Sequence, residues 1–337
     1  MHAPAVLMRA VTAARNSLYD RGWMPSRRLD LPIVSVGNLS VGGTGKTPMV
    51  VWLARALIER DRRPGLLSRG YRAKEGALND EGRLLERLLP GVPQVQQPDR
   101  VSGALELESR GADVVLLDDG FQHRRLERDL DFVLIDATRP WGLPSEDGRD
   151  PVCALLPRGL LREGLASLGR ASAIVITRSD AVTPAQLRDL DERLEFVAPG
   201  IPRLLARHRA LGVRSEEKLE PLESLRGRPV RLVSGIGNPT AFERTARDAG
   251  VEVRGVHVFP DHHAFRAEEL EQLEGEDEFL VTAKDSVKLE ALGVPHLVLE
   301  VEFDVVRGLA VLNALLDALP ESRASRERAA LHEGLHG

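Results

Sequence analysis

The sequence predicts an α/β protein with a mostly parallel sheet and a second, smaller α/β domain. Its length of 337 residues suits about two domains. Short apolar runs rich in β-branched residues recur and end in polar residues, as strands buried on both faces of a parallel sheet do. After a break rich in proline and glycine near residues 199–202, the alternation of strand-like and helix-like segments starts again. We therefore expect a first domain over residues 1–205 and a second over residues 206–304.

Hydrophobic periodicity gives the order of the elements. A glycine-rich turn joins the first expected strand of the sheet to its first helix, and a last helix is expected to pack back on the first domain. The expected strands cover residues 31–36, 114–117, 132–135, 173–177, 230–234, 251–258 and 279–282, and the expected helices cover residues 48–59, 240–249, 267–273 and 306–318.

Composition and charge exclude several classes of protein. Hydrophobic residues make up 42% and charged residues 29% of the chain, which is typical of a globular protein and not of a disordered or disulfide-stapled one. The 46 basic and 51 acidic residues give a net charge of −5, which argues against a general nucleic-acid binder. The only cysteine, Cys153, has no partner for an internal disulfide, which indicates a reducing compartment such as the cytoplasm. We infer no obligate protein partner.

The first 30 residues are locally basic, with five arginines against two acids. On a helix, Leu7, Val11, Ala14 and Leu18 fall on one apolar stripe. Two interpretations remain open: a helix docked on its own domain, and an interfacial helix attracted to anionic lipid. The longest apolar stretch, residues 3–8, is far shorter than the roughly 20 residues of a membrane span. No transmembrane span is predicted.

The glycine-rich loop before the first helix of the sheet has the pattern of a phosphate-binding P-loop. Glycines let backbone N–H groups point at phosphate oxygens, Lys46 reaches the β and γ phosphates, and the Thr47 hydroxyl suits Mg²⁺. A serine stands where the usual pattern has its first glycine. The predicted nucleotide-binding residues are Ser40, Val41, Gly42, Gly43, Thr44, Gly45, Lys46 and Thr47.

An apolar strand over residues 114–117 runs directly into Asp118 and Asp119. A carboxylate at the carboxyl end of a strand beside the P-loop strand is where the Mg²⁺ of a bound nucleotide lies. We therefore expect a P-loop NTPase-like core in which Asp118 and Asp119, together with Thr47, bind the metal.

Two further clusters are candidates for catalysis: Asp80 with Glu81, and Asp261 with His262 and His263. Taken alone, such clusters are most often solvated loops or caps. A kinase that acts on a hydroxyl group needs a base, and a carboxylate supported by a histidine would serve. Arginines in residues 68–72 and 158–162 supply fixed positive charge suited to a phosphorylated substrate.

Taken together, these motifs resemble the tetraacyldisaccharide 4′-kinase family, the lipid A 4′-kinases of outer-membrane lipid biosynthesis. The resemblance covers nearly the whole chain. Two departures are that Asn79 precedes Asp80 where the family has glycine, and that Arg158 and Leu160 replace alanine and proline. The motifs, in order, are residues 36–48, 68–71, 80–81, 118–123, 156–163, 234–239, 259–262 and 282–285.

The resemblance implies a kinase that transfers the γ-phosphoryl group of ATP, with Mg²⁺, to the 4′-hydroxyl of an acylated glucosamine disaccharide 1-phosphate, giving a product of lipid IVA type. It implies that Lys46 and Asp80 are catalytic and that Asp80, the base, is paired with His262, although His263 stays open as the partner. It also implies a peripheral protein of the cytoplasmic face of the inner membrane, which favours the interfacial interpretation of the first helix. The expected substrate contacts are Ser68, Arg69, Tyr71, Glu81, Gln122 and Arg162.

Two other functions compete with this one. A switch ATPase that controls a partner protein also carries a Gly-Gly-x-Gly-Lys-Thr loop, but Val41 stands where that class has its signature lysine. A kinase of a small soluble molecule would share the nucleotide site, and it would differ by acting without detergent or liposomes.

Overall fold

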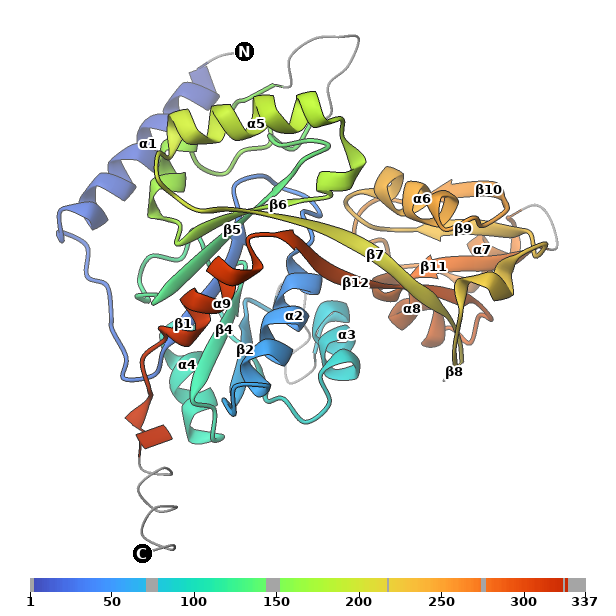
Figure 1. The fold of residues 1–337 in the computed structure, drawn as a ribbon, viewed down its shortest axis with the longest axis horizontal. Helices are drawn as coiled ribbons and strands as arrows, with labels where there is room; N and C mark the ends of the chain where they lie inside the picture. The colour runs from blue at the N-terminus through green and yellow to red at the C-terminus, as the bar shows by residue number, and fades with distance from the viewer. Residues whose placement is uncertain are drawn as a thin grey trace, which may run out of the picture. The chain divides into compact units, whose positions relative to one another are not determined.

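The computed structural model describes residues 3–70, 78–143, 152–216, 218–273, 277–323 and 325–326 (Figure 1). The contacts within these residues divide the chain into two units. The smaller unit consists of Leu78–Leu88 and His208–Asp304, and the larger unit contains the other described residues. The chain passes from the larger to the smaller unit within β7 (Arg203–Ser215) and returns within β12 (Leu297–Arg307).

The larger unit contains a parallel sheet with the strand order β7-β6-β5-β1-β4-β2-β3. The predicted α/β class and mostly parallel sheet are thereby confirmed. Parallel strands place their carboxyl ends on one edge of the sheet, which is where ligands bind in open α/β folds. The strands are β1 (Ile33–Asn38), β2 (Pro64–Ser68), β3 (Gln94–Gln96), β4 (Val114–Asp118), β5 (Leu130–Asp136), β6 (Ala173–Thr177) and the first part of β7. The helices are α1 (Ala3–Asp20), α2 (Lys46–Ile58), α4 (Arg100–Ser109), α5 (Pro184–Val197) and α9 (Leu309–Asp317).

The central strands of this sheet are buried along their whole length. Every residue of β1, β4, β5 and β6 is buried, which explains why these strands are mostly apolar and do not alternate between apolar and polar residues. Leu190 and Leu194 of α5 pack in one core cluster with Ile174 of β6. Residues of α4 and β4 form a second cluster. These two core clusters hold the strands in place, and with them the strand ends that carry the polar side chains.

The smaller unit contains a parallel arrangement in the order β10-β9-β11-β12, and β8 runs antiparallel to β7. Phe242 and Ala246 of its second helix pack against Leu232 and Leu280 of the strands. The strands are β8 (Lys218–Glu220), β9 (Val230–Ser234), β10 (Val253–Val258), β11 (Glu278–Thr282) and β12, and the helices are α3 (Asp80–Leu88), α6 (Pro239–Asp248), α7 (Ala267–Glu271) and α8 (Ala283–Glu290).

Helix α3 packs within the smaller unit, although its place in the sequence predicts that residues 78–88 belong to the first domain. It lies against α8, where Arg87 donates hydrogen bonds to Glu290 Oε1 at 2.8 Å and to the backbone oxygen of Ala283 at 3.4 Å. Hydrophobic periodicity reveals that a helix has an apolar face but not which core that face covers. The grouping of α3 therefore could not be predicted from its sequence.

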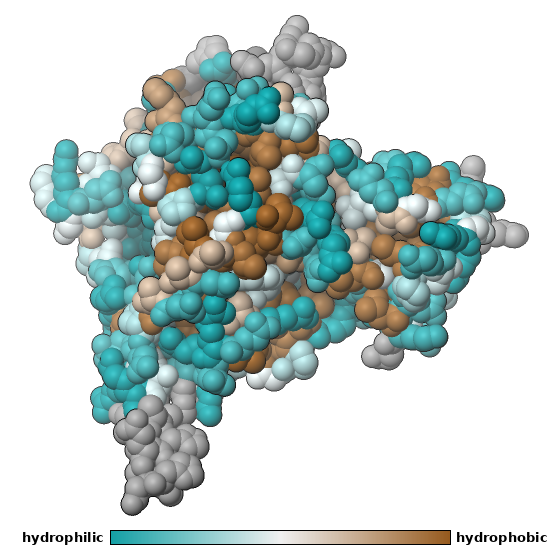
Figure 2. Space-filling model, in the orientation of Figure 1, coloured by the Kyte–Doolittle hydropathy of each residue, from teal (hydrophilic) through white to brown (hydrophobic). Residues whose placement is uncertain are grey.

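The last helix is shorter than the predicted span of 306–318. Strand β12 continues to Arg307, and Gly308, with φ of 89°, lies at the N-terminus of α9. Within the larger unit, Arg60 donates a hydrogen bond to Asp317 Oδ1 at 2.7 Å. Leu309 and Val311 of α9 are exposed, and Figure 2 shows hydrophobic residues in the region where Figure 1 places this helix.

Helix α1 is attached to the larger unit through its second half. Arg15 Nη2 donates to the backbone oxygen of Gln122 at 2.6 Å, and Asn16 Nδ2 donates to Glu163 Oε2 at 3.0 Å. Residues 6–11, by contrast, are exposed in an unbroken run. The structure therefore leaves the first half of the predicted apolar stripe uncovered by the described residues.

Candidate active site

The glycine-rich loop follows β1 and leads into α2. Gly42 and Gly45 have φ of 123° and 92°, in the left-handed region that favours glycine. Asn38 Nδ2, at the end of β1, donates to Thr44 Oγ1 at 3.0 Å inside the loop. Because α2 begins at Lys46, the positive end of the helix dipole faces the loop. The loop thus has the backbone conformation and the dipole of an anion-binding site.

Side chains at the ends of β5 and β6 support this loop. Thr177 Oγ1 donates to the backbone oxygen of Thr44 at 2.9 Å, and Arg178 Nη1 donates to that of Gly43 at 3.1 Å. Arg178 also forms an ion pair with the buried carboxylate of Asp136. Burial would raise the pKa of Asp136, but Arg178 and local hydrogen bonds hold it below its usual value. Arg178 therefore links a charged strand end to the loop backbone.

Asp119 joins the loop to the turn after β4. Arg162 Nη1 donates to both carboxylate oxygens of Asp119, at 2.8 and 2.7 Å. Lys46 Nζ lies 3.5 Å from Asp119 Oδ1. Burial would raise the pKa of Asp119, whereas Lys46 and Arg162 lower it. Asp119 also has a φ of 54°, a strained value for a residue other than glycine. We call Lys46, Asp119 and Arg162 the Asp119 cluster.

Asp118 and Thr47 present oxygen ligands at the same edge. Asp118 is the last residue of β4, is buried, and pairs in register with Val36 of β1. Carboxylate and hydroxyl oxygens are donors that Mg²⁺ accepts beside water and phosphate oxygens. The donor chemistry therefore fits Mg²⁺ that arrives with a nucleotide. Among the residues that the structure describes, no group of three or more His, Cys, Asp or Glu is placed to hold a metal ion.

Arg162 and Gln122, both predicted substrate contacts, lie at the Asp119 cluster. The backbone N–H of Arg162 donates to the oxygen of Leu39 at 2.7 Å, next to the loop. Gln122 Oε1 accepts from Arg162 Nη1 at 3.4 Å, and its Nε2 donates to the backbone oxygen of Asn38 at 2.9 Å. The structure thus brings together side chains that are far apart in the sequence, while their contact with a substrate stays a prediction.

Arg100 is a buried cation of this edge that the sequence analysis missed. Its side chain is almost fully buried, and Nη1 donates to the backbone oxygen of Gln97 at 2.7 Å. Burial and the charge of Arg69 lower the pKa of Arg100, whereas Asp119 and Asp118 raise it. Arg100 is the first residue of α4 and comes soon after β3. Because β3 has only three residues, its pattern is too short to be detected from the sequence, and the position of Arg100 at a strand end could not be recognised.

The remaining predicted contacts of the larger unit lie near β2. Ser68 is the last residue of β2, and its backbone oxygen accepts from the N–H of Gln97 at 3.0 Å. Arg69 follows it and is exposed. Tyr71 lies outside the described residues. Asp136 and Arg178 were also missed, although both stand at the ends of predicted strands, which was the available signal.

In the smaller unit, Asn79 positions the acidic first turn of α3. Its Oδ1 accepts a hydrogen bond from the N–H of Gly82 at 2.9 Å, as an N-terminal cap does. Asp80 and Glu81 are consequently the first two residues of the helix, where negative charge is favoured by the helix dipole. The asparagine that departs from the family pattern thus has a structural role of its own.

The two neighbouring histidines have different surroundings. His263 Nε2 lies 2.7 Å from Glu269 Oε1, and its ring stacks on Phe259 with 4.8 Å between the ring centres. His262 adopts a φ of 61°. Burial and a neighbouring lysine lower the pKa of His262, and Asp261 and Glu81 raise it. A carboxylate of α3, that of Glu81, is thus among the groups that act on His262, while the pairing of His262 with Asp80 stays a prediction.

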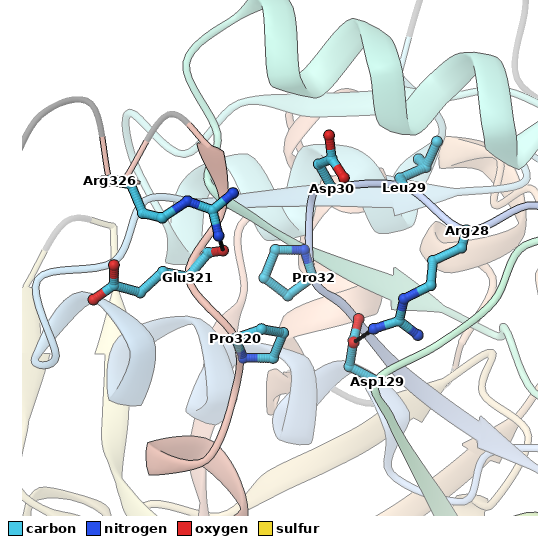
Figure 3. A pocket seen from close by; sticks show the side chains of 8 residues that line it. All are labelled: Arg28, Leu29, Asp30, Pro32, Asp129, Pro320, Glu321 and Arg326. Atoms are coloured by element: carbon cyan, nitrogen blue, oxygen red, sulfur yellow. Dashed lines mark hydrogen bonds and ion pairs between the residues drawn. The ribbon is translucent and has the colours of Figure 1, made fainter.

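A polar cavity of ≈ 160 Å³ lies elsewhere in the larger unit (Figure 3). Its two arginines already have partners: Arg28 Nη2 bonds Asp129 Oδ1 at 2.7 Å, and Arg326 Nη1 bonds the backbone oxygen of Glu321 at 3.2 Å. It shares no residue with the loop or with the Asp119 cluster. We therefore assign it no part in the active site.

We predict that Arg178→Ala weakens nucleotide binding by about tenfold or more, which corresponds to about 1.4 kcal/mol. The substitution removes the donor to Gly43 and leaves Asp136 without its strongest counter-ion. The free energy of unfolding should therefore also fall by about 3 kcal/mol. Arg139→Ala is the matched control, because Arg139 contacts Asp136 at 3.4 Å while Arg178 and its bond to the loop stay in place. Calorimetric titration with ATP and thermal unfolding measure the two effects. An Arg178→Ala protein with wild-type affinity would show that the loop holds its shape without this bond.

Comparisons with known proteins give a consistent result. The family model described as tetraacyldisaccharide-1-P 4′-kinase matches residues 2–320. A tetraacyldisaccharide 4′-kinase of Anaeromyxobacter dehalogenans is 40% identical over 92% of this chain and 87% of the relative. A protein of the same name from Aquifex aeolicus is 36% identical over 82% of this chain and 85% of the relative.

A solved structure agrees with the sequence relatives. The crystal structure of LpxK from Aquifex aeolicus in complex with ATP superposes with a TM-score of 0.71 at 32% sequence identity, and it covers 94% of this chain and 97% of that one. The loop, the acidic turn and the family model thus point the same way, and the chain belongs to the tetraacyldisaccharide-1-phosphate 4′-kinase family.

Proposed function

We propose that this protein transfers the γ-phosphoryl group of ATP to the 4′-hydroxyl of an acylated glucosamine disaccharide 1-phosphate, with Lys46, Asp80 and His262 as its catalytic residues. As a member of its family it is an ATP-dependent kinase of lipid A biosynthesis that uses Mg²⁺. The observation that carries the proposal is the Asp119 cluster at the mouth of a P-loop. Two cations held by one carboxylate beside such a loop would be able to contact a transferring phosphate.

Phosphoryl transfer asks mainly for positioning and charge neutralisation, because the protein forms no covalent bond with the phosphate. The loop amides of residues 40–47 hold the β and γ phosphates, and Lys46 moves from Asp119 to the γ-phosphate. Arg162 compensates the charge that develops in the transition state. This electrostatic interaction is stronger in a site of low dielectric constant than in water. Asp119 sets the resting positions of both cations.

A bound Mg²⁺ would supply positive charge that neutralises part of the charge of the ATP phosphates. Thr47, Asp118 and Asp119 are the residues proposed to hold it. Asp118 suits a direct contact because its backbone is fixed in the centre of the sheet between β1 and β2. Asp119 would hold it with a carboxylate that also accepts two hydrogen bonds from Arg162.

On the acceptor side, Asp80 accepts the proton of the 4′-hydroxyl as the sugar oxygen attacks the γ-phosphorus. The bond from that phosphorus to the β–γ bridging oxygen breaks, and ADP leaves. His262 orients Asp80 and tunes its basicity. The proposed substrate contacts are Ser68, Arg69, Tyr71, Glu81, Gln122 and Arg162.

We further propose that α1 makes peripheral contact with the cytoplasmic face of the inner membrane. Leu7 and Val11 are 66% and 56% exposed, and Val6 is 65% exposed. An exposed apolar stripe flanked by arginines is typical of helices that lie in the lipid interface. Within the described residues, no helix combines the length and the apolar character that a bilayer crossing requires.

The reaction is tested by offering γ-³²P-labelled ATP with the acylated disaccharide 1-phosphate, beside a panel of water-soluble sugars. We expect label only on the lipid, and a fall in turnover of at least about a hundredfold in Lys46→Ala, which loses charge stabilisation of the transition state. Lys218→Met, at an exposed lysine, is the control. Transfer to a soluble sugar alone, or ATP hydrolysis without transfer, would favour one of the competing functions.

Asp80→Asn is expected to lower turnover by about 10²- to 10⁴-fold, the usual size of a general-base contribution, with little change in ATP affinity. The substitution keeps the shape of the side chain and removes its basicity. The rate should also lose its acidic limb when it is measured against pH. Glu86→Gln, on an exposed position of the same helix, should behave as wild type. Normal turnover with an unchanged pH profile would remove Asp80 from the mechanism.

Leu7→Glu combined with Val11→Glu should shift the protein away from liposomes that contain anionic lipid, because two charges enter the apolar stripe. Ala185→Glu with Arg188→Gln on α5 changes the net charge equally and serves as the control. Co-sedimentation with liposomes measures binding, and thermal unfolding measures stability. If the α1 variant stays bound but unfolds more readily, the stripe packs against protein instead of lipid.

A further inference from the structure

Lys284 is a charged residue beside His262 to which the proposed reaction gives no role. It belongs to the first turn of α8, and its Nζ lies 3.5 Å from His262 Nε2 and 3.3 Å from Asp261 Oδ1. The lysine side chain is largely buried, with 22% of its surface exposed. A cation held at this distance restricts how the imidazole can carry its proton.

The chemistry of the two groups decides the protonation of the ring. An ammonium group has three donors and no acceptor, so a ring nitrogen that faces it must offer a lone pair. Asp261 Oδ2, which could instead accept a proton from Nε2, lies 3.8 Å away, and this is too long for a hydrogen bond. In the neutral ring the proton therefore lies on Nδ1, since the bond made by one nitrogen sets the state of the other.

The backbone of His262 is held by the same helix that carries Lys284. The N–H of His262 donates to the oxygen of Gly235 at 3.1 Å, and the N–H of Gly235 donates to Asp285 Oδ2 at 3.1 Å. Asp285 is fully buried and pairs with Lys288 at 3.0 Å. Helix α8 thus fixes His262 twice, through Asp285 to its backbone and through Lys284 to its ring.

We propose that Lys284 is a positioning residue that holds His262 in the tautomer with the proton on Nδ1, so that an N–H donor remains for the catalytic carboxylate. The consequence for catalysis rests on the proposed function, in which His262 supports Asp80. The tautomer itself does not, because it is a property of the protein without substrate. A fixed tautomer matters because a histidine in the wrong one cannot donate to its carboxylate, and that error costs about 10⁴-fold in a serine protease triad.

The charges around His262 agree with a neutral ring. Burial lowers the pKa of His262, and so do Lys284 and Lys288 of α8, while Asp261 of the same turn and Glu81 of α3 raise it. The charged form is thus disfavoured at neutral pH. Removing the ammonium of Lys284 should raise the pKa of His262, because one lowering charge is lost and both raising charges remain.

The test is ¹⁵N NMR of the histidine rings in the full-length protein, with His262 assigned by the loss of its signals in His262→Gln. We expect the neutral ring of the wild type to carry its proton on Nδ1. Lys284→Met should raise the pKa of His262 and populate the other tautomer. Lys284→Arg keeps a donor-only cation and should restore the wild-type spectrum. Lys218→Met, at a lysine side chain that is 80% exposed, should change nothing.

Two results would overturn the inference: a wild-type ring with its proton on Nε2, or a folded Lys284→Met protein with the tautomer and pKa of the wild type. Turnover measured against pH adds the link to catalysis. Lys284→Met should lower kcat by about tenfold to a hundredfold, as loss of a supporting interaction does at other sites. Because Asp80 and His262 would titrate as a coupled pair, the variant should also move the acidic limb to higher pH. If the spectra are as expected while Lys284→Met and His262→Gln keep full activity, the tautomer assignment holds and the role of His262 in the proposed reaction is rejected.

Discussion

The arrangement of the sheet edge that carries the P-loop depends on one interaction, the pairing of the Asp119 carboxylate with both Lys46 and Arg162. This edge of the sheet gathers cations, because Arg69 and Arg100 lie there as well. Without a counter-charge these groups would repel one another in a partly buried place, where electrostatic interactions are stronger than in water. Asp119 offsets that repulsion, and its left-handed backbone conformation is strain that the surrounding structure sustains. The cluster also connects the loop after β1, the turn after β4 and the segment that carries Arg162.

Strain recurs where charge is placed. Five described residues other than glycine have φ in the left-handed region. Asp61 and Glu216 take no part in the candidate site, and the other three are Asp119, Arg178, at 52°, and His262, at 61°. Each of these three carries a side chain that the active site uses, either in the proposed reaction or in supporting the loop. A backbone that turns sharply at such a residue aims its side chain in a direction that a regular strand or helix does not offer. Such residues tend to cluster at functional sites.

Much of this could be predicted from the sequence, because the loop and the acidic turn are local patterns whose residue types follow from the chemistry of phosphate and metal. The class of fold and the central strands were equally accessible, since buried parallel strands are continuous apolar runs. Arg100 could not be assigned, and the strand end that carries Arg178 gave no sign of its contact with the loop, because the partners of both residues are distant in the chain. The place of α3 was hidden for the same reason: about 200 residues separate it from the α8 residues that it contacts. A local pattern in a single sequence does not show which distant residues a side chain will contact.

The chain divides its cations by type, and this has a practical consequence for labelling. Of its 46 basic residues only five are lysines. Arginine makes most of the ion pairs, as suits a planar, bidentate group. Among the four described lysines, Lys46, Lys284 and Lys288 are largely buried, whereas the side chain of Lys218 is 80% exposed. Reagents that acylate amines will therefore meet few positions on the folded protein, and among the four described lysines they should react first with Lys218, the most exposed one. The scarcity of lysine makes the native protein nearly a site-specific chemical probe.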